Sequence, residues 1–220
     1  MRRPLILWGA SGQAKVLLDF LQPFGYEPVA VFDNNREAAP PREGIPIYCG
    51  EAGFREWHAS YTGTTPQAVI AIGSPGQVRL EMQRFLARYN IDFVQAVHPS
   101  AVVARTAKLG RGCQILAHGV VAAETTLGDQ CIVNTSASVD HECVVGNGVH
   151  VAPGARVLGC VEVGEFTFIG AGSVVLSRLK IGSNSIVGAG AVVVKDVPDD
   201  VVVYGNPAEF KRAVSSAARP

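Results

Sequence analysis

Apolar positions follow two different rhythms along the chain. Up to residue 96, short apolar runs alternate with stretches in which apolar residues recur at helical spacing. These runs predict strands at 5–8, 29–33, 68–73 and 93–97, and the stretches predict helices at 14–25 and 78–90. Strands that alternate with helices indicate a small α/β unit built on a parallel sheet.

From residue 97 onward, an apolar branched residue falls at every sixth position without a failure. The series is Val97, Val103, Leu109, Ile115, Val121, Leu127, Val133, Val139, Val145, Val151, Val157, Val163, Ile169, Val175, Ile181, Val187 and Val193. A step of six residues advances an α-helix by about 600°, so these side chains would be spread over every helical face. The period therefore predicts short strands separated by corners.

A second period, three times as long as the first, lies over it. Five glycines recur at this longer spacing, and each directly follows an apolar residue of the series: Gly110, Gly128, Gly146, Gly164 and Gly182. Because three steps of six make one turn of a triangular coil, each glycine marks the same corner of successive coils, and we call the longer spacing the coil period. The pattern predicts a solenoid in which coils stack and bury one branched side chain per side.

Composition narrows the classes of partner. Lys plus Arg equals Asp plus Glu at 19 each, so no excess positive charge attracts nucleic acid or an anionic membrane. No apolar run approaches the roughly 20 residues that span a bilayer, and we expect a cytoplasmic protein. The five cysteines lack any C-x-x-C pair, which makes a disulfide framework improbable. Cys113 and Cys131 lie one coil period apart and are expected to stack in the interior, as are Cys143 and Cys160.

The first strand-to-helix turn carries the sequence Gly9-Ala10-Ser11-Gly12. Glycines at such a turn let a ligand approach the backbone, and the helix N-terminus offers free N–H groups to an anion. Asp33 ends the second predicted strand, where its carboxylate would accept hydrogen bonds from a ribose or base. The full G-x-G-x-x-G fingerprint is missing, and a purely structural turn explains the glycines equally well.

Two histidines lie beside the six-residue series. His141 falls two residues after Val139 within NTSASVDHECVVG (134–146), and His150 falls directly before Val151. Asp140 and Glu142 flank His141. A carboxylate that accepts the Nδ1 proton fixes the imidazole tautomer and leaves Nε2 as a base near neutral pH. A surface or subunit-packing histidine is the alternative.

The sequence resembles the left-handed β-helix acyltransferases with hexapeptide repeats. Within them it is most similar to the family of bacterial sialic-acid O-acetyltransferases and nucleotide-linked amino-sugar N-acetyltransferases. The resemblance covers nearly the whole chain. Its carriers are GASGQAK in the first turn, FDN at 32–34, AIGSP at 71–75, HPSA at 98–101, the NTS…HEC segment, GVHVAPGA at 148–155 and GNPA at 205–208.

The resemblance implies a role for each matching residue. His141 matches the catalytic base, Glu142 its orienting acid, and Asn134 a polar residue beside the acceptor sugar. His150 and Gly159 match residues at the acetyl-CoA thioester, the latter through its N–H toward the developing oxyanion, and Ala171 and Ala189 match further acetyl-CoA contacts. The pocket for the nucleotide of the acceptor is matched by Gly9, Ser11, Gly12, Asp33 and Gly73. Many relatives carry histidine where this chain has Gln13, which leaves the base and the sugar open.

The resemblance thus implies a Rossmann-like nucleotide-sugar-binding domain at 1–96, a left-handed parallel β-helix at 97–205 and a C-terminal tail at 206–220. The implied reaction is transfer of an acetyl group from acetyl-CoA, without a metal, to the amino group at C4 of a nucleotide-linked amino sugar for bacterial surface glycan or glycoprotein synthesis. A homotrimer with active sites between copies is expected.

Two alternatives stay open at this point. One is O-acetylation of sialic acid or another small hydroxyl acceptor, which shares every motif. The other is a non-catalytic or metal-binding β-helix that uses His118, His141 and His150. Because the step from His118 to His141 is not a multiple of the coil period, we do not expect these imidazoles to converge.

Overall fold

The computed structural model describes residues 2–73 and 76–214. The chain divides into two compact units, one formed by Met1–Gly73 with Glu81–Ala96 and the other by Ser74–Leu80 with Val97–Pro220. No helix within the described ranges has both the length and the apolar character needed to cross a bilayer.

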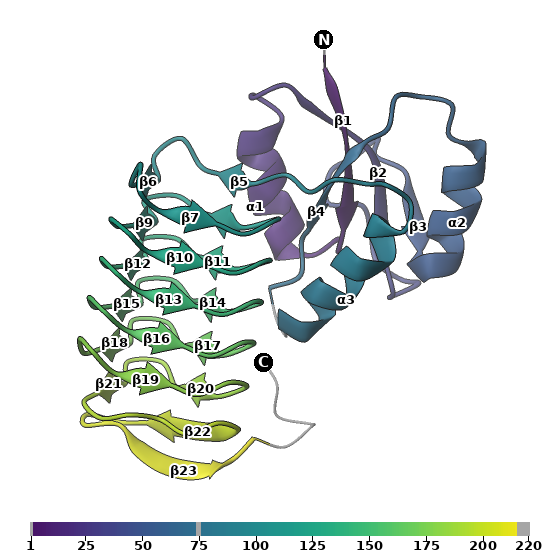
Figure 1. The fold of residues 1–220 in the computed structure, drawn as a ribbon. Coiled ribbons are helices and arrows are strands. Elements are labelled where there is room, and N and C mark those ends of the chain that lie inside the picture. Colours follow the sequence, from purple (N-terminus) through teal and green to yellow (C-terminus); the bar gives the residue numbers. More distant parts are fainter. Residues whose placement is uncertain (1, 74–75, 215–220) are drawn as a thin grey trace. The chain divides into compact units, whose positions relative to one another are not determined.

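The first unit is a four-stranded parallel sheet with helical connections (Figure 1). Its strands lie in the order β3-β2-β1-β4. Apolar strand residues such as Leu5 and Leu7 are completely buried, and the rings of Trp8, Phe32 and Phe54 pack against one another. The elements are β1 (Arg3–Trp8), α1 (Gly12–Leu21), β2 (Tyr26–Asp33), β3 (Ile47–Cys49), α2 (Gly50–Ser60), β4 (Gln67–Ile70) and α3 (Gly76–Ala87). The start of α3, up to Leu80, belongs to the second unit.

Several details of this unit differ from the sequence prediction. β4 ends at Ile70 rather than at residue 73, and α3 ends at Ala87 rather than at residue 90. β3 and α2 were not predicted, because α2 buries only Gly53, Phe54 and Trp57 and its apolar stripe is too sparse to stand out. The first helix ends at Leu21 rather than at residue 25. The strand expected at 93–97 shrinks to β5 (Ala96–Val97), which belongs to a sheet of the second unit.

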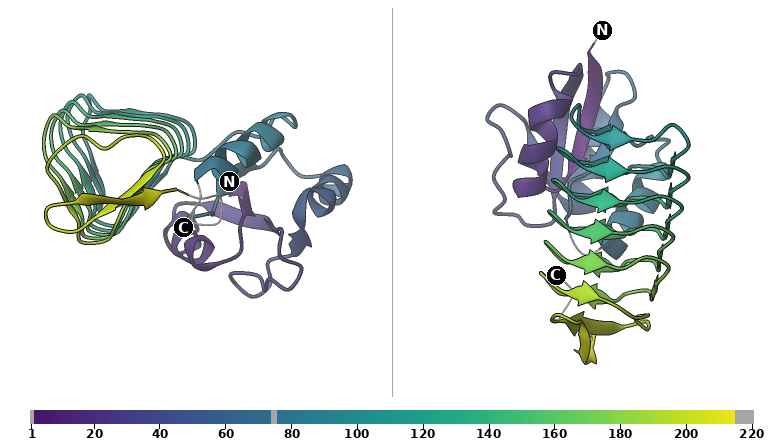
Figure 2. Two further views of the ribbon diagram at one scale, coloured as in Figure 1. Left: turned by 90° about the horizontal axis from the view of Figure 1, so that it is seen from below. Right: turned by 90° about the vertical axis from the view of Figure 1, so that its left-hand side faces the viewer.

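The second unit is a parallel β-helix with a triangular cross-section (Figure 2). Short strands recur at the spacing of the six-residue series, and equivalent strands of successive coils pair with each other; Thr126 lies opposite Val144, for example. Three sheets form the three sides of the triangle. The strands are β6 (Val102–Val103), β7 (Lys108–Leu109), β8 (Gln114–Ile115), β9 (Val120–Val121), β10 (Thr126–Leu127), β11 (Ile132–Val133), β12 (Ser138–Val139), β13 (Val144–Val145), β14 (His150–Val151), β15 (Arg156–Val157), β16 (Glu162–Val163), β17 (Phe168–Ile169), β18 (Val174–Val175), β19 (Lys180–Ile181), β20 (Ile186–Val187) and β21 (Val192–Val193).

The branched residues of the six-residue series fill the centre of the coil. Every member from Ile115 to Val193 is buried, as the period predicts. The first three members depart from the prediction: Val97 is exposed, and Val103 and Leu109 are only half-buried. The period specifies that a side chain points inward, but burial also needs a coil on each side, and these residues belong to the first coil.

Close packing of backbone explains the glycines that recur at the coil period. A Cβ atom on Gly110 would lie 2.4 Å from the carbonyl carbon of Gly128, and one on Gly164 would lie 2.8 Å from that of Gly182. Neighbouring coils therefore touch at this corner, and no larger residue fits. Left-handed backbone occurs at other corner positions, where non-glycine residues adopt it, including Glu142 (φ 58°) and Cys160 (φ 60°).

A buried arginine belongs to the second unit although it precedes the coils in sequence. Arg79 donates from Nε to the carbonyl oxygen of Gln130 at 2.9 Å and from Nη2 to that of Gly148 at 2.7 Å. Its side chain is fully buried, and burial lowers its pKa to about 10. No periodicity in the sequence predicts the burial of this residue.

The last coil ends in an antiparallel pair, β22 (Val201–Tyr204) with β23 (Glu209–Ala213). Part of the segment expected to be a tail is therefore a strand. The remainder from residue 215 lies outside the described residues.

Candidate active site

The corner between β12 and β13 presents His141 and Glu142 to solvent. Backbone hydrogen bonds fix this corner, because Asp140 donates its N–H to Val157 and Glu142 donates its N–H to Ala123, each at 2.9 Å. The Asp140 carboxylate accepts the N–H of His141 at 2.9 Å. The Asp140 carboxylate thus stabilises the backbone of the corner, and this hydrogen bond does not involve the imidazole ring.

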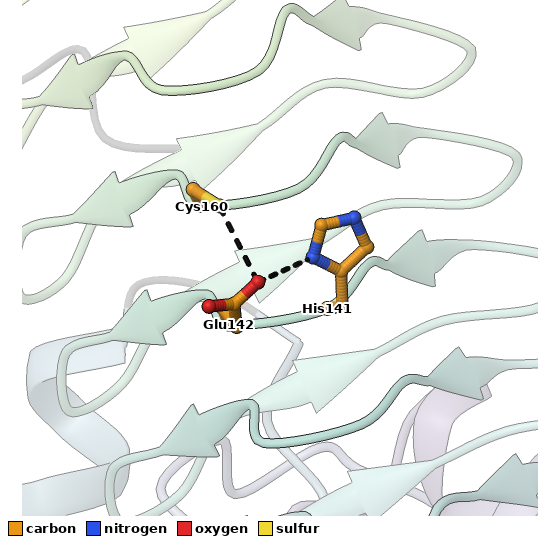
Figure 3. Close-up of side chains that lie close together, drawn as sticks. All are labelled: His141, Glu142 and Cys160. Carbon is orange, nitrogen blue, oxygen red and sulfur yellow. Dashed lines mark hydrogen bonds and ion pairs between the residues drawn. The ribbon is translucent and has the colours of Figure 1, made fainter.

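Glu142 contacts the ring of His141 directly. Nδ1–H of His141 donates to Oε2 of Glu142 at 3.0 Å (Figure 3). Both side chains are more than half exposed, so an acceptor molecule has access to them. This arrangement selects the tautomer whose Nε2 lone pair is free to accept a proton.

Gly159 lies against the same imidazole. A Cβ atom at Gly159 would lie 2.6 Å from both Cε1 and Nε2 of His141. Among the residues that the structure describes, none accepts a hydrogen bond from the N–H of Gly159. The resemblance groups Gly159 with His150 at the acetyl-CoA thioester, but Gly159 follows His141 by one full coil and therefore stacks on it.

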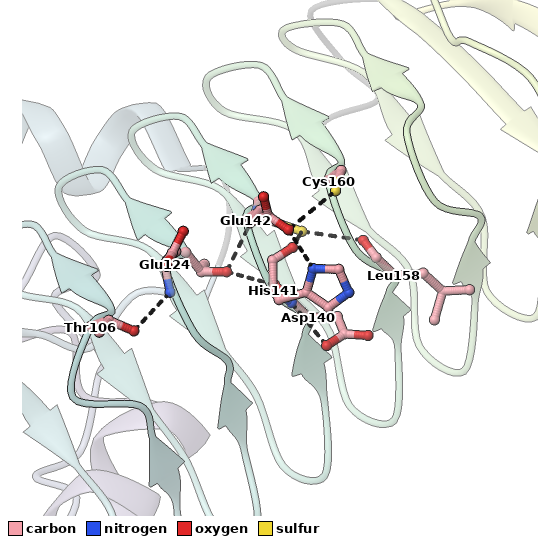
Figure 4. A network of polar contacts seen from close by, with 9 residues as sticks. Thr106, Glu124, Asp140, His141, Glu142, Leu158 and Cys160 are labelled. Carbon is pink, nitrogen blue, oxygen red and sulfur yellow. Dashed lines mark hydrogen bonds and ion pairs between the residues drawn. The ribbon is translucent and has the colours of Figure 1, made fainter.

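Cys160 departs from its expected place in the interior. Its thiol is half-buried, and Sγ lies 3.8 Å from Oε2 of Glu142 (Figure 4). Cys143, by contrast, is completely buried and donates its S–H to the Leu158 carbonyl oxygen at 3.2 Å. The expectation that both thiols stack alike was wrong for Cys160, because it falls one position short of a full coil after Cys143 and therefore lies on the corner. The coil period relates Cys160 to Glu142 instead.

His150 lies on β14, on a different sheet from the strands that flank His141. Its ring is nearly buried, and it packs edge-on against Phe168 with ring centres 5.1 Å apart. Nδ2 of Asn134 donates to Nε2 of His150 at 3.0 Å, and Oδ1 of Asn134 accepts the Thr135 N–H at 2.7 Å. Asn134 therefore orients His150.

Ala171 and Ala189 are exposed on the corner between the sheet of His150 and the six-stranded sheet. They occupy equivalent positions of successive coils, and the Gly190 N–H donates to the Ala171 carbonyl oxygen at 2.9 Å. The six-stranded sheet separates this corner from that of His141. Of the expected acetyl-CoA residues, Gly159 therefore lies beside the expected base, whereas Ala171 and Ala189 lie on a different edge of the same chain.

The three histidines of the metal alternative do not converge. His118 lies on the corner between β8 and β9, His141 on the corner between β12 and β13, and His150 within β14. His118 and His141 therefore occupy different edges of the triangle, and His150 lies on one of its sides. Within the described part of the chain these three form no group with metal-ligand spacing.

The first unit contains a cavity of about 420 Å³ at the ends of β1 and β2. Ala10, Ser11, Lys15, Asp33, Asn35 and the segment 38–40 line it. Gly9 shapes the entrance turn: its φ is 106°, and a Cβ atom there would lie 2.6 Å from the Ala71 carbonyl oxygen. Gly12 begins α1, and Gly73 follows β4, with open space around both.

Asp33 organises this cavity through its two oxygens. Oδ2 accepts the N–H of Ala10 and Oδ1 accepts the N–H of Asn35, each at 2.8 Å. The carboxylate therefore joins the glycine turn to the loop after β2. Lys15 adds a positive charge to the lining. It was not among the predicted site residues, although its place in the first turn of the predicted helix, next to the glycine turn, could have indicated it.

Comparisons with known proteins agree with this architecture. Residues 4–85 match the model of the PglD N-terminal domain, and residues 160–195 match the model of the bacterial transferase hexapeptide with six repeats. A comparison with curated protein sequences gives no match.

Solved structures match nearly the whole chain. PerB from Caulobacter crescentus, in complex with CoA and GDP-perosamine, is 33% identical with a TM-score of 0.87, and the match covers 95% of this chain and 97% of PerB. The acetyltransferase domain of PglB from Neisseria gonorrhoeae FA1090, in complex with acetyl coenzyme A, is 30% identical with a TM-score of 0.84 and coverages of 96% and 100%. WeeI from Acinetobacter baumannii AYE is 26% identical with a TM-score of 0.84 and coverages of 95% and 100%.

Proposed function

The chain belongs to the family of hexapeptide-repeat, left-handed β-helix acyltransferases that includes nucleotide-linked amino-sugar N-acetyltransferases, and on that premise we propose that it moves an acetyl group from acetyl-CoA to the amino group at C4 of a nucleotide-linked amino sugar. The observation that carries the proposal is the exposed His141–Glu142 pair with Gly159 packed against the imidazole. The proposed reaction belongs in the cytoplasm, the compartment that supplies both acetyl-CoA and nucleotide sugars.

His141 acts as the general base in this proposal. Its Nε2 accepts a proton from the sugar amine while the nitrogen attacks the thioester carbonyl, and Glu142 stabilises the resulting imidazolium through Nδ1. The Gly159 N–H donates to the developing oxyanion, and coenzyme A leaves as the thiolate. A positioned base contributes about 10²–10⁴ in rate, and an oxyanion donor contributes a similar factor. Two of the matched Caulobacter structures are mutants in which a histidine is replaced by asparagine or alanine. A histidine of that enzyme has therefore been a target of mutagenesis.

A homotrimer completes the site. His141 and Gly159 occupy one edge of the β-helix, whereas Ala171 and Ala189 lie on the edge at the far side of the six-stranded sheet, and His150 lies on the eight-stranded sheet that ends at that second edge. The edge of one copy that binds acetyl-CoA must therefore meet the His141 edge of a second copy. A triangular prism has flat sides that pack around a threefold axis, and that symmetry repeats the same pairing three times.

The cavity of the first unit binds the nucleotide of the acceptor. The start of α1 offers N–H groups, the Ser11 side chain makes no capping hydrogen bond, and Lys15 supplies a positive charge. These groups suit a diphosphate, while Asp33 keeps the glycine turn in position to receive it.

Release of free thiol from acetyl-CoA tests the function. Purified protein is supplied with UDP-, GDP- and dTDP-linked amino sugars, with free sialic acid, and with the matching hydroxyl sugars. We expect thiol release with one class of nucleotide-linked amino sugar and an acetamide in the product by mass spectrometry. Release only with hydroxyl acceptors would establish O-acetylation in its place, and no release with any acceptor would contradict the transferase.

A further inference from the structure

Three ligand atoms suited to a transition metal meet at the His141 corner. A ring nitrogen of His141, a carboxylate oxygen of Glu142 and Sγ of Cys160 all lie within 4.8 Å of one another. Nδ1 is the ring nitrogen that faces Glu142. The proposed transfer uses His141 and Glu142 but gives the thiol no task. We propose that these three side chains form an inhibitory zinc site, a proposal that rests on the proposed function for its effect but not for the binding itself.

The coil-stacking hydrogen bonds hold the three groups together. Cys160 follows Glu142 by one full coil, so both occupy the same corner of neighbouring coils with left-handed backbone. The Cys160 N–H donates to the His141 carbonyl oxygen at 2.9 Å. Because these bonds belong to the solenoid ladder, the cluster is set by the most regular part of the fold.

Two of the three separations between ligand atoms are close to those around one tetrahedral ion, and the third is no more than 4.8 Å. Ligand atoms held at about 2.0–2.3 Å from zinc lie about 3.3–3.8 Å apart. Nδ1 of His141 is 3.0 Å from Oε2 of Glu142, and that oxygen is 3.8 Å from the Cys160 sulfur (Figure 3). Only small side-chain shifts are needed to place an ion between them.

The ligand atoms of the three side chains and the exposure of His141 and Glu142 indicate which ion would bind. One thiolate, one imidazole and one carboxylate favour zinc over the magnesium and calcium that prefer oxygen ligands. The side chains of His141 and Glu142 are 54% and 57% exposed, so water fills the fourth position without a cost of burial. On the same stack of corner positions, Glu124 adds a negative charge one coil before Glu142, and Arg178 adds a positive charge one coil after Cys160.

Zinc at Nδ1 removes the basicity of His141. A neutral imidazole that coordinates a metal through Nδ1 carries its proton on Nε2, which then has no lone pair for the sugar amine. The ion also takes the carboxylate that otherwise stabilises the imidazolium. Bound zinc therefore stops proton transfer without entering the reaction, and a chelator restores it.

Replacement of the thiol separates the metal site from catalysis. Equilibrium dialysis of the full chain against Zn²⁺ should give one ion per chain, and Co²⁺ should give a thiolate charge-transfer absorption. Cys160→Ser should lower zinc affinity by at least about tenfold, abolish that absorption and keep the wild-type kcat in the absence of metal. Cys49→Ser, which changes an exposed thiol of the other unit, is the matched control and should bind zinc as the wild type does.

The activity assay then measures whether bound zinc inhibits acetyl transfer. Zinc should inhibit the wild type reversibly, and the same concentration should leave Cys160→Ser active. Equal zinc affinity in the wild type and Cys160→Ser would overturn the metal site and leave the proposed function standing. One zinc ion bound through Cys160 with full turnover would overturn the inhibition and, with it, His141 as the base.

Discussion

The imidazole of His141 lies where a side chain at position 159 would be. A Cβ atom on Gly159 would come within 2.6 Å of Nε2, a distance that no real pair of such atoms tolerates. The glycine is therefore a requirement of the histidine's position on the neighbouring coil.

Gly159→Ala should lower catalytic activity and leave the stability of the fold nearly unchanged. Gly159 has no positive φ, so its backbone accepts alanine and the methyl group acts on the His141 ring alone. We expect kcat to fall about 10²-fold, the scale of a misplacement of about 1 Å, with little change in melting temperature. Steady-state kinetics at saturating acetyl-CoA beside thermal unfolding measures both. An unchanged kcat would show that the ring works equally well in another position.

His141→Ala should lower kcat by about 10²–10⁴ while acetyl-CoA affinity and oligomeric state stay the same. The loss of a base should also flatten the rising limb of the pH–rate profile. His118→Asn, at an exposed corner whose left-handed backbone suits asparagine, is the control and should behave as the wild type. If His141→Ala retains more than about a third of the kcat, the imidazole is structural and His150 becomes the next candidate.

Asp33→Ala should weaken binding of the nucleotide sugar and spare acetyl-CoA. The substitution removes both hydrogen bonds that join the glycine turn to the loop after β2, so the cavity loses its shape. Calorimetry with each ligand separately measures the effect, and Asp19→Ala, whose side chain is 88% exposed, is the control. Equal losses for both ligands would contradict the assignment of the cavity to the acceptor.

Arg79→Met should destabilise the protein. The substitution leaves the buried carbonyl oxygens of Gln130 and Gly148 without their charged donor, at a cost of at least about 2 kcal/mol. For a chain of this length we expect a fall in melting temperature of about 4–8 °C. Arg111→Met, which changes an exposed arginine, should melt as the wild type does. Equal melting of all three proteins would mean that the buried contacts contribute nothing.

Light scattering should give a mass of about three times 23.2 kDa. Because His141 and His150 lie on different edges of one chain, co-expressed His141→Ala and His150→Ala chains should form mixed trimers that recover part of the activity. A single-chain mass under assay conditions, or mixed trimers as inactive as each parent, would contradict a site shared between copies.

The sequence by itself determined the coil. Each inward residue from Ile115 to Val193 and each corner glycine contacts the next coil. Because these contacts recur at a fixed separation along the chain, they are visible as a period in the sequence. The same coil period relates His141 to Gly159 and Glu142 to Cys160, so the composition of this corner was implicit in the numbering. Resemblance to the family supplied the chemistry of the histidine.

Only the tertiary structure decided contacts between elements that share no period. The burial of Arg79 against two corner carbonyls, the hydrogen bond from Asn134 to His150 and the joining of two loops by Asp33 depend on side-chain packing between segments with unrelated spacing. The exposure of Val97 belongs here too, because a repeat pattern does not say where the stack begins. Periodicity encodes which neighbours recur, whereas the contacts made once depend on how the whole chain closes on itself.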